Sequence, residues 1–172
     1  MNPLNYCTLE VPGRQEFGSV VNEVLSRVFW QVHILNASQG SCLAVDFPEC
    51  ASGTPLKAPT LGRKIRVFAE EASVLTKLLD NLRSLPLREY ITINRIRNFN
   101  PQTYEGAFIT LSRYRVKSRA TVRKCQSDIH ARLKRLEEQN NNPRPYLRVH
   151  STSTKQDFSI ILQRESYPTA GP

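Results

Sequence analysis

An apolar stripe between residues 17 and 35 is the feature that most limits how this chain can fold. Its seven members are Phe17, Val20, Val21, Val24, Val28, Val32 and Leu35. They recur at spacings of three and four residues, which is the period of an α-helix with one buried side. The sequence therefore predicts a helix over residues 16–37 that other elements must cover.

Short segments of alternating apolar and polar residues predict strands on both sides of this helix. We expect strands at 6–11, 41–47, 64–69 and 90–96, with a second amphipathic helix at 71–82. The resulting order, β-α-β-β-α-β, is that of the ferredoxin-like (RRM-like) fold, which many RNA-binding sheets use. We therefore expect an α+β protein in which residues 1–103 form a ferredoxin-like domain that ends in a linker at 98–103.

A strongly basic stretch, residues 113–135, indicates the kind of partner. It holds nine Lys or Arg and a single acid, Asp128, in a chain of net charge +9. An apolar stripe within it predicts a helix and consists of Val122, Cys125, Ile129, Leu133 and Leu136. Most charge runs are solvated helix faces, but such faces usually mix the two signs. A row of cations suits a phosphate backbone, because each cation can displace a condensed counterion, so we favour nucleic acid as the partner.

Residues 104–172 are expected to form a smaller, RNA-binding domain that carries this arginine-rich helix and short strands. The strands are predicted at 106–111, 146–151 and 158–163. The last two are joined by the sequence S-T-S-T-K-Q-D (151–157), whose composition is ordinary for a hairpin turn. The same hydroxyls, together with Lys155, are also suited to binding a phosphate or a sugar 2′-hydroxyl.

Length and composition exclude several classes of protein. At 172 residues with 40% hydrophobic content, the chain is globular and can bury a real core. It has no apolar run long enough to span a bilayer and no signal-peptide pattern, so we expect a cytoplasmic protein without membrane contact. Its four cysteines are scattered, with no histidine at zinc-ligand spacing, so we expect no disulfide, metal or cofactor.

One histidine is a candidate for chemistry. His33 lies off the apolar stripe and in the last turn of the first predicted helix, near Ser26 and Phe29. A lone histidine is more often structural than catalytic. Its position outside the core face weakens the structural interpretation without removing it.

A set of segments in fixed order resembles a known family. They are F-W-Q-V-H (29–33), V-D-F-P (45–48), L-G-R-K-I-R-V (61–67), S-R-Y-R-V-K-S (112–118), the arginine-rich helix and S-T-S-T-K-Q-D-F-S-I (151–160). Together they resemble the CRISPR repeat-processing endoribonuclease of type I-F (Csy) systems. The resemblance implies a subunit bound to the 3′ hairpin of the CRISPR RNA, beside other subunits of a type I-F-like Cascade complex. It also implies the two-domain fold expected above.

The resemblance assigns roles to residues of the site. His33 matches the catalytic histidine, Ser151 matches the serine that holds the nucleophilic 2′-hydroxyl, and Ser153 matches its neighbour in the same site. Phe158 matches an aromatic residue that stacks at the base of the RNA hairpin. Histidine can deprotonate a 2′-hydroxyl near neutral pH without a metal, and the expected product is a 2′,3′-cyclic phosphate.

The resemblance also implies how the hairpin is bound. Arg113 and Arg115 match a linker pair that reads base edges, although the family has glutamine where Arg115 stands. The cationic helix matches one that lies in the major groove of the hairpin. The cations expected to contact RNA are Arg113, Arg115, Lys117, Arg119, Arg123, Lys124, Arg132, Lys134, Arg135 and Lys155. Among these, Arg132, Lys134 and Arg135 are expected to insert most deeply.

Two other functions stay open at this point. The family usually ends with a tyrosine-bearing segment followed by Gly-Leu-Ser, whereas the last aromatic residue here is Tyr167, before Pro172. This departure favours a catalytically weak or inactive cap that holds the RNA hairpin in a type I-F-like effector complex, including the transposon-associated relatives. A generic double-stranded-RNA-binding protein is the third alternative, and it would need neither His33 nor Ser151.

Overall fold

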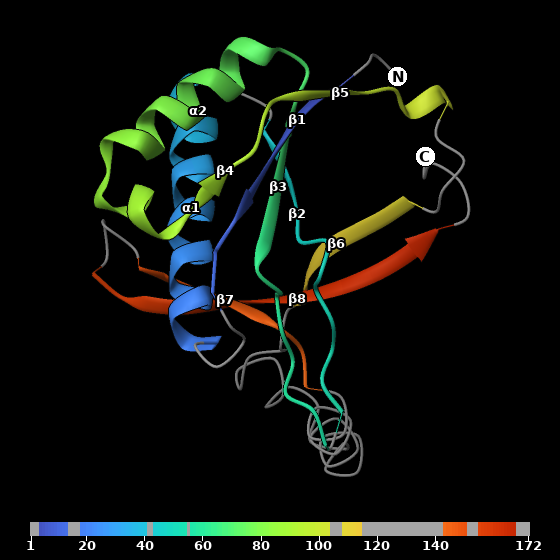
Figure 1. Cartoon of the computed structure of the whole chain (residues 1–172). Coiled ribbons are helices and arrows are strands. Elements are labelled where there is room, and N and C mark those ends of the chain that lie inside the picture. The colour runs from blue at the N-terminus through green and yellow to red at the C-terminus, as the bar shows by residue number, and fades with distance from the viewer. Residues whose placement is uncertain are drawn as a thin grey trace, which may run out of the picture.

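The computed structural model of the protein describes residues 4–13, 18–40, 43–54, 56–103, 108–114, 143–150 and 155–167. These residues form an α+β structure with two α-helices and two antiparallel sheets (Figure 1). The helix expected within residues 113–135 lies outside the described residues from position 115 onward.

The first sheet is built by the N-terminal part of the chain. Its strands are β1 (Leu4–Glu10), β2 (Ala44–Asp46), β3 (Lys64–Ala69), β4 (Thr92–Ile93) and β5 (Arg97–Phe99). They lie in the order β2-β3-β1-β4, β5 also pairs with β1, and every pairing is antiparallel. With α1 (Gly18–Gln39) and α2 (Ala72–Ser84), the chain follows the predicted order β-α-β-β-α-β as far as β4.

The continuous strand predicted at 90–96 is wrong. Tyr90 ends a 3₁₀ helix, η2 (Pro86–Tyr90), and β4 and β5 are two short strands with a break between them. Leu9 pairs with Ile93 whereas Tyr6 pairs with Arg97, so the register against β1 shifts by one residue across the break.

The break has the character of a β-bulge, in which one strand carries an extra residue. An inserted residue moves every later side chain to the other face of the strand. The alternation of apolar and polar residues in the sequence therefore cannot predict where such a residue is inserted. The linker expected at 98–103 therefore contains the end of β5 and a further 3₁₀ turn, η3 (Pro101–Thr103).

The predicted apolar stripe of α1 is largely confirmed. Its buried side chains are Val21, Val24, Leu25, Val28, Val32 and Leu35. Val20 is 44% exposed, because it lies about 90° from the centre of the buried side. On α2 the buried residues are Leu75, Leu78, Leu79 and Leu82, at the spacing expected of the predicted amphipathic helix.

The second sheet contains β6 (Phe108–Tyr114), β7 (Tyr146–His150) and β8 (Asp157–Tyr167). Its order is β6-β8-β7, again antiparallel. Both β6 and β8 extend beyond their predicted ends, because they pair with each other along the whole length of β6. Arg113, the first residue of the basic stretch, accordingly lies in a strand.

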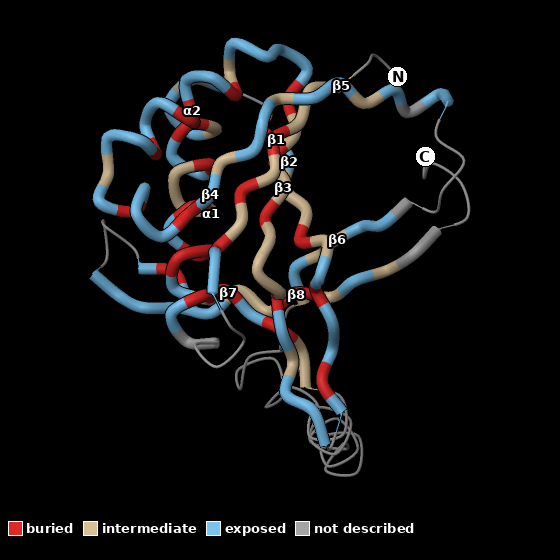
Figure 2. Tube along the Cα trace, viewed as in Figure 1, coloured by how far each residue is buried: buried red, intermediate tan, exposed pale blue. Residues whose placement is uncertain are grey.

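Both sheets contribute to one core. Leu147, Val149 and Leu162 of the second sheet are buried in the same cluster as α1, α2 and the first sheet (Figure 2). The loop before β3 is joined to the chain just before β7 by a hydrogen bond from Gly53 N to Pro143 O, at 2.7 Å. The domain boundary between residues 103 and 104 therefore stays a prediction. The two predicted domains share one cluster of buried side chains.

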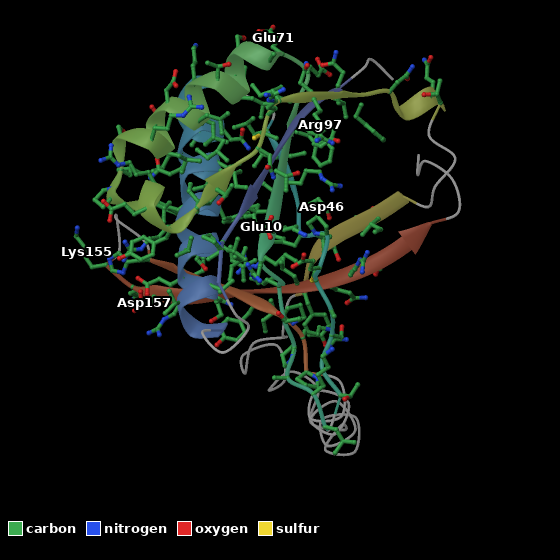
Figure 3. The ribbon with its side chains drawn as sticks, in the orientation of Figure 1. Glu10, Asp46, Glu71, Arg97, Lys155 and Asp157 are labelled. Carbon is green, nitrogen blue, oxygen red and sulfur yellow. The ribbon has the colours of Figure 1, made fainter. Side chains whose placement is uncertain are left out.

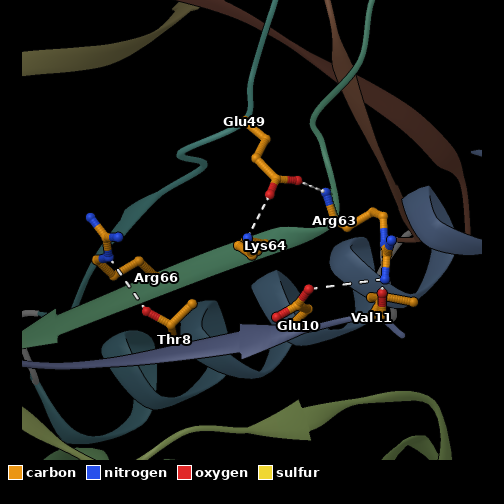
Figure 4. Close-up of polar contacts among 7 residues, drawn as sticks. All are labelled: Thr8, Glu10, Val11, Glu49, Arg63, Lys64 and Arg66. Carbon is orange, nitrogen blue, oxygen red and sulfur yellow. Dashed lines mark hydrogen bonds and ion pairs between the residues drawn. The ribbon is translucent and has the colours of Figure 1, made fainter. Parts of the chain in front are cut away.

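A polar network fixes the start of β3 (Figure 4). Glu49 accepts hydrogen bonds from the Lys64 ammonium and from the Arg63 backbone N–H, both at 2.8 Å. The hydrogen bond from Lys64 is the main reason that the pKa of Glu49 lies below its ordinary value. Gly62 has φ +76°, and a Cβ there would lie 2.1 Å from the Cβ of Glu49, so this turn requires glycine.

Replacing Leu147 by alanine tests whether the second sheet shares the core. Leu147 is fully buried, so Leu147→Ala should lower the free energy of unfolding by about 2–5 kcal/mol, through lost burial and the cavity left behind. Urea unfolding followed by circular dichroism measures this change. Leu56→Ala is the matched control, because Leu56 is 100% exposed. Equal stability of the two variants would contradict a shared core.

Candidate functional site

A groove of about 740 Å³ lies where α1, the turn before η2 and the end of the β7–β8 hairpin meet. Helix α1 contributes Asn22, Glu23, Ser26, Arg27, Trp30 and Gln31. The other walls are Leu85, Pro86 and Leu87, and Tyr146, Arg148, Val149, His150 and Asp157. The groove is therefore lined mostly by polar and aromatic side chains from segments far apart in the sequence.

Two polar residues of α1 hold β7 against the helix. Asn22 donates from Nδ2 to the backbone oxygen of Tyr146 at 2.7 Å, and the backbone N–H of Arg148 donates to Ser26 Oγ at 3.1 Å. Ser26 is only 4% exposed although it lies away from the apolar stripe. Tyr146 and Arg148, two residues apart on β7, thus bind residues one turn apart on α1. From Tyr146 to His150, β7 therefore runs toward the C-terminal end of the helix.

His33 lies on this same side of α1. At 100° per residue, Asn22, Ser26 and His33 fall within about 40° of one another around the helix axis. The imidazole is exposed, as predicted, and its ring centroid lies 5.1 Å from that of Trp30, which lines the groove. Within the described part of the chain, His33 makes no hydrogen bond or ion pair, so both ring nitrogens are accessible there. The helix continues to Gln39, so His33 lies before its last turn.

The turn end of the β7–β8 hairpin carries a charged cluster that the sequence did not predict. His150 Nδ1 lies 2.9 Å from Asp157 Oδ1, and Arg148 Nη2 lies 3.5 Å from Asp157 Oδ2. His150 and Asp157 are also register partners at the last pair of the β7–β8 ladder. The hydrogen bond from His150, and next the Arg148 charge, hold the pKa of Asp157 below its ordinary value. In the sequence, His150 directly precedes the S-T-S-T-K-Q segment and Asp157 directly follows it, and this placement could have predicted that the two residues pair.

Lys155 and Phe158 lie at the same end of the hairpin. Lys155 is exposed and has φ 55°, in the left-handed region, and Figure 3 shows it beside Asp157. Phe158 is 38% exposed and pairs with Val149 on β7, and Val149 lines the groove. Cross-strand partners share a face of a sheet, so Phe158 lies on the face of Val149, opposite to His150 and Asp157, and it is not among the residues that line the groove.

Arg113 is not part of this group. It is exposed on β6, and β8 separates β6 from β7 in the sheet. Close by, the Arg144 guanidinium lies 3.9 Å from the centroid of the Tyr114 ring. This cation–π contact brings together residues that precede and follow positions 115–142, which contain most of the basic stretch.

The other predicted site residues lie outside the described part of the chain. They are Ser151, Ser153, Arg115, Lys117, Arg119, Arg123, Lys124, Arg132, Lys134 and Arg135. Of the predicted site, the structure therefore locates His33, Lys155 and Phe158 near the groove and Arg113 away from it.

Two further properties concern the described residues only. In that part of the chain no group of three or more His, Cys, Asp or Glu is arranged to hold a metal ion. None of its helices is both long and apolar enough to cross a membrane.

Cys7 and Cys50 are buried free thiols, and burial raises the pKa of each.

Comparison with known proteins adds one finding. The family model described as CRISPR-associated protein (Cas_Csy4) matches residues 6–171. This match covers nearly the whole chain, including α1, the basic segment and the β7–β8 hairpin. No curated protein matches the chain.

The charged cluster at the hairpin end should stabilise the fold in a pH-dependent way. Because the pKa of Asp157 is lower in the folded chain, its contacts with His150 and Arg148 stabilise the fold above the carboxyl's ordinary pKa of about 3.9. That contribution is lost as the pH falls through the lowered pKa. Asp157→Asn should therefore lower the melting temperature at pH 7 and have no effect at pH 2. An equal loss at both pH values would contradict the assignment.

Proposed function

The chain belongs to the Csy4 family of CRISPR-associated proteins, and from that premise we propose that it is a metal-independent endoribonuclease. Its proposed substrate is the repeat hairpin in precursor CRISPR RNA. The proposed product complex is the protein bound to the 3′ stem-loop, as a subunit of a Cascade-like assembly. The observation that carries the proposal is the exposed His33, stacked against Trp30 on the side of α1 along which β7 advances.

His33 is the proposed general base. It would take the proton from a ribose 2′-hydroxyl, whose oxygen attacks the adjacent phosphorus in line as the bond to the 5′ oxygen breaks. A 2′,3′-cyclic phosphate and a 5′-hydroxyl result, and the departing oxygen gains a proton. An imidazole nitrogen that is not hydrogen-bonded to any described residue can accept this first proton.

Ser151 and Ser153 are proposed to hold the ribose, as their match to the family implies. Ser151 follows Arg148 by three residues, which is a reach of about 10 Å. His33 follows Ser26 by seven residues, which is about 10 Å along the helix axis. Because Arg148 is bonded to Ser26, the chain has the reach to bring Ser151 to His33.

Cations near the groove would stabilise the charge that develops on the phosphate oxygens. Lys155 is exposed and makes no ion pair with any described residue, whereas Arg148 is paired with Asp157. We therefore assign this role to Lys155. Phe158 is proposed to stack on the base pair at the foot of the stem, because it is an exposed aromatic residue next to Asp157 on β8.

The basic segment is proposed to bind the stem. Its helix would lie in the major groove with Arg132, Lys134 and Arg135 inserted most deeply. The cation–π contact between Arg144 and Tyr114 brings together the residues that precede and follow positions 115–142. We further propose a ferredoxin-like domain over residues 1–103 and an RNA-binding domain over 104–172. The antiparallel β2-β3-β1-β4 order supports the first of these assignments.

One observation supports a second candidate function, a hairpin-binding cap with little or no activity. General bases in active sites are commonly oriented by a hydrogen-bonded third group, as in catalytic triads. Among the described residues His33 has no such partner. A cap would retain tight hairpin binding and lose nothing when His33 is removed.

Substitution of His33 separates the two functions. With a 3′-end-labelled repeat hairpin in EDTA, the unaltered protein should cut once at the foot of the stem. His33→Ala should slow this cleavage by about 10²–10⁴-fold, the usual contribution of acid–base catalysis, and should leave hairpin affinity within about twofold. Ile34→Ala is the control, because Ile34 is the next exposed residue on the helix. Tight binding without cutting by any of the three proteins would establish the cap.

Substitution of Arg132 tests the proposed stem contact. Arg132→Ala should weaken hairpin binding and lower the slope of log K against log salt by about one unit, as expected for one lost phosphate contact. Fluorescence anisotropy over a series of salt concentrations measures both. An unchanged slope would remove Arg132 from the phosphate contacts.

A further inference from the structure

The first sheet has one face that α1 and α2 cover and one that they do not. Along β1 and β3, the odd-numbered residues Cys7, Leu9, Ile65 and Val67 are buried in the core. Their even-numbered neighbours Tyr6, Thr8, Arg66 and Phe68 point to the opposite face and are partly exposed. We call this second face, with Phe99 and Arg97 of β5, the open face.

Three aromatic rings meet on the open face. The Tyr6 and Phe68 centroids lie 5.7 Å apart with a tilt of 36°, and Phe68 and Phe99 lie 6.3 Å apart in an edge-on arrangement. The rings come from β1, β3 and β5, and Tyr6 and Phe68 are direct register partners. The three strands therefore present an aromatic surface whose outer side is partly exposed.

Cations surround these rings. The Arg66 guanidinium lies 5.4 Å from the Tyr6 centroid, and its Nη1 is 3.8 Å from Asp46 Oδ2. Glu10, the other acid of the open face, lies 3.9 Å from Arg63. Arg97 is the register partner of Tyr6, is exposed, and makes no ion pair with any described residue. Figure 3 shows Arg97, Asp46 and Glu10 distributed along this sheet. Each acid is already matched by a cation, so Arg97 adds uncompensated positive charge.

Aromatic rings on the central strands of a sheet, with cations beside them, suit single-stranded RNA. Each unpaired base offers a flat π-face that stacks on a ring, while arginine neutralises the neighbouring phosphate. A duplex would not fit these rings, because its bases are already stacked on one another.

We propose that the open face is a second RNA-binding surface, which binds about two or three unpaired nucleotides by stacking on Tyr6, Phe68 and Phe99. It goes beyond the proposed cleavage function, because it requires neither a hairpin nor His33. None of these residues lines the groove, which is formed by α1, η2 and the β7–β8 hairpin on the helix side of the sheet (Figure 1). One protein molecule can therefore hold a hairpin and an unpaired segment together.

Binding of a labelled oligouridine of about ten nucleotides, followed by fluorescence anisotropy, tests this surface. Phe68→Leu and Tyr6→Leu keep an apolar side chain but remove the ring, and should weaken oligouridine binding about fivefold or more. Tyr90→Leu is the matched control, because Tyr90 is a 53% exposed aromatic on η2 and should have no effect. Circular dichroism melting confirms that each variant is folded.

Arg97 provides an independent measurement. Arg97→Ala should lower the salt slope for oligouridine by about 0.7, the value for one phosphate contact to a single strand. Lys77→Ala removes an equally exposed charge from α2, on the covered side of the sheet, and should leave the slope unchanged.

The outcomes separate this proposal from the proposed nuclease. Hairpin cleavage should be unchanged in the Phe68→Leu variant, and oligouridine binding should be unchanged in His33→Ala. Oligouridine affinity that is the same in folded Phe68→Leu, Tyr6→Leu and unaltered protein would overturn the proposal. If these variants instead lost binding to a protein subunit while keeping oligouridine affinity, the face would be a protein interface and the proposal would equally be overturned.

Discussion

The burial of α1 on two sides is the constraint on which the rest of this structure depends. Its apolar side, from Val21 to Leu35, packs into the core, while Asn22 and Ser26 on another side hold β7 by hydrogen bonds. Ser26 Oγ donates to Asn22 Oδ1 at 3.3 Å and accepts from the Arg148 backbone N–H, so this strand position uses the buried hydroxyl both as donor and as acceptor. The helix thereby fixes the position of the second sheet relative to the first.

The candidate site follows from this arrangement. His33 shares the β7-facing side of α1 but lies beyond the last hydrogen bond to the strand, so its imidazole is exposed beside the groove. The charged cluster of His150, Asp157 and Arg148 closes the ladder where the S-T-S-T segment begins. The rigid elements thus end at the place where the proposed chemistry requires a positioned ribose. Neither α1 nor α2 covers the open face of the first sheet, because both helices lie on its other side.

Much of the fold was predictable because it depends on local periodicity. The apolar spacing predicted the helices α1 and α2, and the apolar–polar alternation predicted the strand β3. The structure confirms all three elements. The break between β4 and β5 was not predictable, since one inserted residue changes the pairing with β1 without changing composition. Likewise, β6 and β8 are longer than their apolar patterns because each provides the hydrogen-bonding partners of the other.

By itself, the sequence determined the identities and spacing of the groups that can do chemistry: an off-stripe histidine, a hydroxyl-rich hairpin and a run of cations. It also determined the family, because those segments occur in a fixed order along the chain. Only the tertiary structure decided which side chains of the described residues meet across separate elements. It showed that Ser26 is a buried anchor, that His150 pairs with Asp157, and that Tyr6, Phe68 and Phe99 form one surface. These contacts join residues from separate elements, and local periodicity carries no information about pairings between elements.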